Sequence, residues 1–191
     1  KTEHLTLFTN FSGLHGTEIV QLAYDDQSEQ LLILYSDGKL DILHNKKVKY
    51  VADLYNKQIT SSKKCNNVTF QGKMAYLSMD FGIITFDVEE HKFVDTYYIA
   101  PEAKEVKVTD VMFCGDSIYA QTPEVVYVAH AEDNIVDFRY WKECKKLPQA
   151  FDTKKGKEYV NKQEDVWKAD GANGVACEYM SGEQMYYLPD G

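Results

Sequence analysis

Histidines are the residues of this 191-residue chain with the widest chemical use, and their spacing argues against a compact site. A structural or catalytic zinc ion needs three or four ligands, which commonly come in short motifs such as His-x-x-x-His. No histidine here has a second histidine at that kind of spacing; the five are His4, His15, His44, His91 and His130. We therefore expect structural or surface roles for them, and we predict no metal site and no cofactor.

Acidic residues cluster at several points, and a hairpin turn is the better interpretation of the most suggestive cluster. The stretch Asp37-Gly38-Lys39-Leu40-Asp41 superficially resembles a calcium loop. It lacks the alternating oxygen ligands and the terminal glutamate of such a loop, and Lys39 stands where an acid would be needed. Other acidic pairs, at Asp25-Asp26, Glu89-Glu90 and Glu132-Asp133, would suggest glycoside hydrolysis only at a known separation. Since the chain also has neither a G-x-S-x-G elbow nor a glycine-rich phosphate loop, we predict no catalytic residue.

The four cysteines lie too far apart for a zinc knuckle or a redox Cys-x-x-Cys motif. They are Cys65, Cys114, Cys144 and Cys177. Cys114 and Cys177 fall within strand-like runs, which favours an interpretation as small buried apolar residues. The disulfide status of all four, and hence the redox compartment, stays open at this point.

Two aromatic pairs, Tyr97-Tyr98 and Tyr140-Trp141, could place a flat ring at the surface. Neighbouring residues of a strand point to opposite faces, so one member of each pair should pack in the core. The other member could stack on a sugar or on an apolar group of a partner. Core packing, or packing between repeated units, is the better interpretation. The Gly13/Gly16 pair is expected only to let the backbone turn.

The composition excludes two classes of partner. A net charge of −9 disfavours nucleic acid, because a phosphate-binding surface needs an excess of lysine and arginine. The local runs Lys46-Lys47 and Lys154-Lys155-Gly156-Lys157 are expected to be solvated loop charges. No stretch approaches the roughly 18 apolar residues that span a bilayer, so we predict a chain that does not cross a membrane.

The elements that would position any site come from a weak repeat with a period near 45 residues. With Val20, Val68, Val111 and Val160 as anchors, the steps are 68−20=48, 111−68=43 and 160−111=49. Within each repeat, short strand-like runs alternate with turns such as Gln71-Gly72. Such periodic groups of short strands are typical of β-propellers. We predict an all-β, propeller-like array of about four four-stranded antiparallel blades.

We expect one propeller segment over 1–191, with blade units at about 18–52, 66–99, 109–141 and 158–189. Residues 4–9 would be the outer strand of a preceding blade. That strand either closes a small ring or is the edge of a larger ring; the second interpretation is favoured and would leave open sheet edges through which the chain could self-associate. Leu31 to Tyr35 is expected to be an inner strand, and Ile135 to Trp141 the outer strand of the third unit.

Several stretches resemble the N-terminal propeller domain of the PorZ family, in collinear order from about Phe8 to Pro148. The resemblance is carried by Ser12 to Ile19, Asp53 to Gln58, Ala75 to Leu77 with Phe81 to Ile83, and Asp95 to Ile99 with Glu105 to Val108. Beyond Pro148 the fourth unit rests on periodicity alone.

The resemblance implies an exported protein of the Bacteroidetes envelope, in the periplasm or at the outer-membrane surface. It also implies a non-enzymatic part in type IX secretion and surface attachment. Expected partners are other envelope or secretion-complex proteins, with a glycan or lipopolysaccharide as a further candidate.

Two alternatives remain open at this stage. Related propellers form the ligand-sensing periplasmic halves of hybrid two-component regulators, although their repeated Gly-Leu-Trp-x-Gly-Thr type motif is absent here. A carbohydrate-active enzyme on a propeller scaffold would need carboxylates that converge at one mouth of a closed ring.

Overall fold

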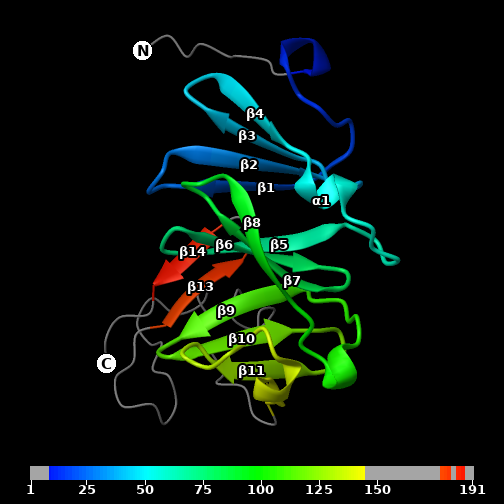
Figure 1. Cartoon of the computed structure of the whole chain (residues 1–191). Coiled ribbons are helices and arrows are strands. Elements are labelled where there is room, and N and C mark those ends of the chain that lie inside the picture. Colours follow the sequence, from blue (N-terminus) through cyan, green and yellow to red (C-terminus); the bar gives the residue numbers. More distant parts are fainter. Residues whose placement is uncertain (1–8, 145–176, 182–183, 188–191) are drawn as a thin grey trace.

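The computed structural model describes residues 9–144, 177–181 and 184–187, and it consists almost entirely of antiparallel strands. Figure 1 shows three sheets stacked in chain order, the first in blue to cyan and the third in green to yellow. The fold is therefore all-β, and the sheets of the described residues form a partial β-propeller that does not close into a ring.

The first two sheets each contain four strands in sequential order. The first comprises β1 (Ile19–Asp25), β2 (Gln30–Tyr35), β3 (Leu40–His44) and β4 (Lys47–Val51). The second comprises β5 (Cys65–Gln71), β6 (Met74–Met79), β7 (Gly82–Asp87) and β8 (Lys92–Tyr97). The short helical turns η1 (Asn10–Ser12) and α1 (Asp53–Asn56) precede these two sheets.

The third sheet has six strands in the order β12-β11-β10-β9-β13-β14. Its central members are β9 (Asp110–Cys114), β10 (Ser117–Gln121) and β11 (Val126–His130), and η2 (Pro101–Ala103) precedes them. The short strand β12 (Lys142–Glu143) follows η3 (Phe138–Tyr140), and the hairpin of β13 (Cys177–Ser181) and β14 (Gln184–Tyr187) extends the other edge.

The strand registers explain the uneven repeat spacing. In the second sheet Gln71 pairs with Met74, so its first turn contains only Gly72 and Lys73, whereas Asp25 pairs with Gln30 across a longer turn in the first sheet. A bulge at the start of both β1 and β5 marks matching positions. The residue that corresponds to Val68 is therefore Leu22, and the anchor at Val20 is displaced by two residues.

The first strand of each sheet contacts the first strand of the next, β1 with β5 and β5 with β9. Buried polar groups join β5 to the third sheet: Asn67 Nδ2 donates to Asp110 Oδ1 at 2.6 Å, and Thr69 Oγ1 donates to the Val111 carbonyl at 2.7 Å. These bonds satisfy polar groups that would be costly to bury alone, so they fix how the two sheets meet.

Two apolar cores lie between the sheets. One joins the first and second sheets and includes Leu32, Ile42, Leu77 and Phe86. The other joins the second and third sheets around Ile83, Val111, Ile118 and Trp141. Each fully buried side chain of this size stabilises the fold by roughly 1.5–3 kcal/mol, so the stacking of the sheets holds the arrangement together.

Of two sequence-based expectations about strands, one is confirmed and the other needs correction. As expected, Leu31 to Tyr35 belongs to an inner strand: β2 lies between β1 and β3, and almost all of its residues are buried. Ile135 to Trp141 does not form an outer strand; η3 occupies Phe138–Tyr140, and β12 takes the outer position. The Trp141 indole donates to the Ile135 carbonyl at 2.8 Å, which folds this stretch back on itself.

The division of the chain into units at 18–52, 66–99, 109–141 and 158–189 remains a prediction. The expected outer strand at 4–9 falls almost wholly outside the described residues, as does most of the fourth unit. The two strands described there, β13 and β14, join the third sheet, with Cys177 opposite Cys114 in the backbone register.

Candidate functional site

A buried carboxylate on β3 organises the most polar cluster of the first sheet. Asp41 has no exposed surface, and its two oxygens accept three hydrogen bonds. The donors are the His15 backbone N–H at 2.7 Å, His15 Nδ1 at 2.8 Å and the Tyr35 hydroxyl at 2.8 Å. The cluster thus ties the segment before β1 to the side of β2 and β3 that faces away from the second sheet.

Two glycines allow this segment to approach so closely. A Cβ on Gly16 would lie 2.2 Å from Cδ1 of the Tyr35 ring, so only glycine fits there without displacement. Gly13 has a φ of 106°, a backbone conformation that favours glycine. The Gly13/Gly16 pair was expected only to let the chain turn; Gly16 in addition lets the backbone rest against the ring of Tyr35.

The chemistry open to this cluster is limited. An ionised carboxylate can only accept hydrogen bonds, so His15 donates from Nδ1, and its ring stacks on Tyr50 with centroids 4.3 Å apart. Burial, then the hydrogen bond to Asp41, raises the pKa of Tyr35 and keeps the phenol protonated. Within the described residues no three metal-ligating side chains gather in one place. The cluster therefore anchors the backbone.

The stretch from Asp37 to Asp41 is a hairpin turn, as predicted, and its two acids have different partners. Asp37 accepts from Lys39 Nζ at 2.7 Å at the surface, whereas Asp41 points into the cluster with His15. Gly38 has a φ of 87°, as a tight turn at this position requires.

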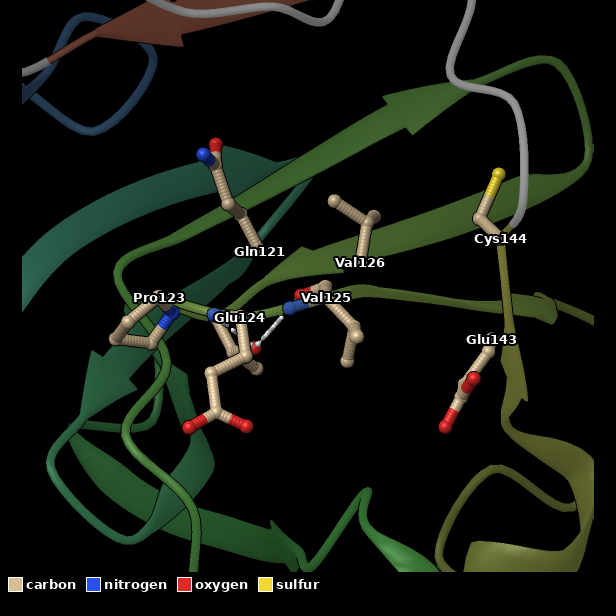
Figure 2. Close-up of a pocket in the computed structure, with 8 residues that line it drawn as sticks. Gln121, Pro123, Glu124, Val125, Val126, Glu143 and Cys144 are labelled. Carbon is tan, nitrogen blue, oxygen red and sulfur yellow. Dashed lines mark hydrogen bonds between the residues drawn. The ribbon is translucent and has the colours of Figure 1, made fainter.

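A hollow of about 430 Å³ lies at one end of the third sheet, between the β10–β11 turn and β12. Figure 2 shows the Glu124 and Glu143 side chains on one side of the ribbon and those of Gln121 and Cys144 on the other. Thr122 closes the turn, since its hydroxyl donates to the Val125 carbonyl at 2.6 Å. The described lining includes two carboxylates and a thiol, and it contains no histidine or lysine.

The remaining predicted residues are dispersed. His44 ends β3 with its Nδ1 3.0 Å from the Glu29 carbonyl, and His91 in the β7–β8 turn contacts Gln30 and Lys49 of the first sheet. His130 is exposed at the end of β11, and His4 lies outside the described residues. Tyr97 belongs to the second core while Tyr98 packs against the first.

The second aromatic pair has one buried and one exposed member, and two of the cysteines differ in burial and in bonding. Trp141 is buried and Tyr140 is 43% exposed. Cys65 is a buried free thiol that donates to the Asn67 carbonyl. Cys114 differs from the expected small buried apolar residue, since it is half-buried and disulfide-bonded. A strand-like pattern around a cysteine does not reveal whether a second cysteine faces it.

One side of the first sheet exposes apolar residues that the other sheets bury. Leu22 and Tyr24 are each 51% exposed, whereas Val68 and Val111, which match Leu22, are 3% and 0% exposed. Ala23, which points the other way, belongs to the core shared with the second sheet. This exposed face, defined by Leu22 and Tyr24, is the side by which the later sheets pack on the sheet before them.

Stacked four-stranded sheets of this kind, joined through their first strands, define a segment of a β-propeller. The profile of the family described as "TSS9, PorZ, N-terminal beta-propeller domain" matches residues 1–142. The chain therefore belongs to this family of type IX secretion propeller domains, as the resemblance implied.

Comparison with solved structures gives the same family. The PorZ protein of Porphyromonas gingivalis, described as an essential bacterial surface component of the type IX secretion system, is 31% identical with a TM-score of 0.64. The match covers 74% of this chain and 19% of that one, so the chain spans about a fifth of the length of this relative.

A more distant similarity is to the extracellular domain of the hybrid two-component system BT3049 from B. thetaiotaomicron. It is 11% identical, covers 96% of this chain and 26% of that one, and has a TM-score of 0.49, which supports no functional argument. A search of curated proteins returned no significant match. None of the described helices is long and apolar enough to cross a membrane.

Proposed function

We propose that this chain is a non-enzymatic interaction module of an exported envelope protein that takes part in type IX secretion and surface attachment. The observation that carries the proposal is the family match over residues 1–142, together with 31% identity to a surface component of that system. Because the chain spans only 19% of that relative, the role of the whole protein is part of the proposal.

Two features of the molecule support the proposal. Disulfides persist in oxidising compartments, so the disulfide-bonded Cys114 fits an exported protein. The exposed face around Leu22 and Tyr24 offers an apolar sheet surface, and such surfaces commonly mark contacts with other folded units. A glycan or lipopolysaccharide, and a second copy of this chain, remain predicted partners that no observation here favours.

The test is an in-frame deletion of residues 9–144 from the native gene, followed by complementation. We expect the deletion strain to lose secretion of type IX cargo and a wild-type copy to restore it, with protein abundance measured in parallel. Normal secretion from the deletion strain would contradict the proposal.

Two sets of substitutions separate an interaction module from an enzyme. Glu124→Ala, Glu143→Ala and Cys144→Ser together remove the reactive groups of the hollow, and we expect them to preserve secretion. Leu22→Asp with Tyr24→Asp should reduce secretion because the exposed face can no longer make an apolar contact. Val94→Asp, at an exposed apolar residue of β8, is the matched control. Loss of secretion only in the first set would contradict a non-enzymatic role.

A further inference from the structure

A histidine in the turn between two strands of the second sheet joins that sheet to the first through two hydrogen bonds. His91 lies in the turn between β7 and β8, and it reaches two strands of the first sheet. Its Nε2 lies 2.8 Å from Gln30 Oε1 on β2, and its Nδ1 lies 2.7 Å from Lys49 Nζ on β4. The contact is therefore a clasp between neighbouring blades, from the β7–β8 turn to the start of β2 and the middle of β4.

The partners determine the protonation state of the ring. The amide oxygen of Gln30 can only accept a hydrogen bond, so Nε2 must carry a proton. The ammonium of Lys49 can only donate, so Nδ1 must present a lone pair. Both bonds form only when His91 is the neutral Nε2–H tautomer.

We propose that this contact is an acid-sensitive clasp. Protonation of His91 expels Lys49 and loosens the contact between the β7–β8 turn of the second blade and the first blade. Protonated Nδ1 would point a hydrogen at the Lys49 ammonium and place two positive charges against each other. The hydrogen bond from Nε2 to Gln30 would remain, so the change is confined to the β4 side of the clasp.

The groups around His91 favour its neutral form. Partial burial, then the charge of Lys49 and that of His44 at the end of β3, lower the pKa of His91, and Asp87 opposes them. Asp87 is already engaged, because its carboxylate accepts from Lys73 Nζ at 3.0 Å and from the backbone N–H groups of Glu89 and Glu90.

The sign of the pH dependence follows from this lowered pKa. Between the folded-state pKa and the ordinary value of 6.5, the unfolded chain binds more protons than the folded one. The stability that the clasp contributes is thus fully present above about pH 6.5 and is lost as the pH falls through the folded-state pKa.

The direct test is an NMR titration of His91 in the intact protein and in the Lys49→Met variant. Removing the Lys49 ammonium should raise the midpoint pH of the His91 titration by roughly 0.2 to 0.7 pH units, the range expected for an exposed charge pair. Lys142→Met, which removes a lysine from the third sheet, should leave it unchanged. An unchanged midpoint in Lys49→Met, or a wild-type midpoint above the ordinary value, would overturn the proposal.

Amide hydrogen exchange supplies a second readout that does not depend on the titration. Between pH 7 and pH 5, after correction for the intrinsic rate, exchange in residues 88–92 and 45–49 should increase in the wild-type protein. His91→Asn keeps a side chain suited to the positive φ of 55° at this position and removes the titrating group, so its protection should not change with pH. An equal loss of protection in both proteins would show that the clasp is not the acid-sensitive element.

Discussion

At the scale of single residues, Asp41 departs most clearly from the repeat. The strand registers place it where the second sheet has Ile84: Leu22, Ile33 and Asp41 lie in a row across the first sheet, as Val68, Leu77 and Ile84 do across the second. A carboxylate in an apolar position is tolerated because His15 and Tyr35 satisfy its oxygens.

Replacing this carboxylate should destabilise the protein strongly. Asp41→Ala leaves the Tyr35 hydroxyl and the His15 N–H without their acceptor, so we expect the free energy of unfolding to fall by about 2–4 kcal/mol in urea denaturation. Asp37→Ala, which removes an exposed ion pair with Lys39, should cost less than about 1 kcal/mol. Equal losses in the two variants would refute the anchoring role of Asp41.

The close approach at Gly16 makes a separate prediction. Gly16→Ala should lower the free energy of unfolding by roughly 1–3 kcal/mol, because the new methyl group collides with the Tyr35 ring. In a double-mutant cycle the same change should cost clearly less in a Tyr35→Ala background, where the collision is absent. Additive costs would mean that another contact is responsible.

At the scale of elements, turn chemistry was the part that could be predicted from the sequence. Gly72 and Gly115 mark two-residue turns at which the backbone has positive φ, and local residue preference is enough to predict them. The prediction of an outer strand ending at Trp141 was wrong, because the conformation there depends on a tertiary contact. The hydrogen bond from the Trp141 indole to the Ile135 carbonyl overrides strand propensity.

The candidate sites were harder to predict, for a related reason. The Asp41 cluster joins residues 26 positions apart, and His91 meets Lys49 across 42, so no local spacing indicates either contact.

The polar link between the second and third sheets yields a prediction at this scale. Asn67→Ala removes the donor that reaches Asp110 and should lower the free energy of unfolding by about 1–3 kcal/mol, measured by chemical denaturation. Asn134→Ala changes an exposed loop residue of the same type and should have almost no effect. If Asn67→Ala also left the free energy of unfolding unchanged, the link would not stabilise the contact between the sheets.

At the scale of the whole molecule, the stability should depend on redox state. Reduction, or a Cys114→Ser substitution, should lower the free energy of unfolding by about 2–4 kcal/mol, seen as a lower Tm in calorimetry. Cys144→Ser, at a cysteine that carries a thiol, is the matched control and should leave the redox effect intact. A Tm insensitive to reductant would contradict a structural disulfide at Cys114.

The molecule as a whole is an arc of stacked sheets with an apolar side left exposed at its first blade. Each later sheet buries the equivalent side against the sheet before it, which explains why Leu22 is exposed while Val68 and Val111 are not.

The proposed role as an interaction module of type IX secretion is tested most directly by affinity purification. The tagged full-length protein is purified from the native envelope after mild crosslinking. If the proposed role is right, the protein lies in the envelope fraction and co-purifies with other components of type IX secretion. Recovery of the protein alone, in the cytoplasmic fraction, would contradict it.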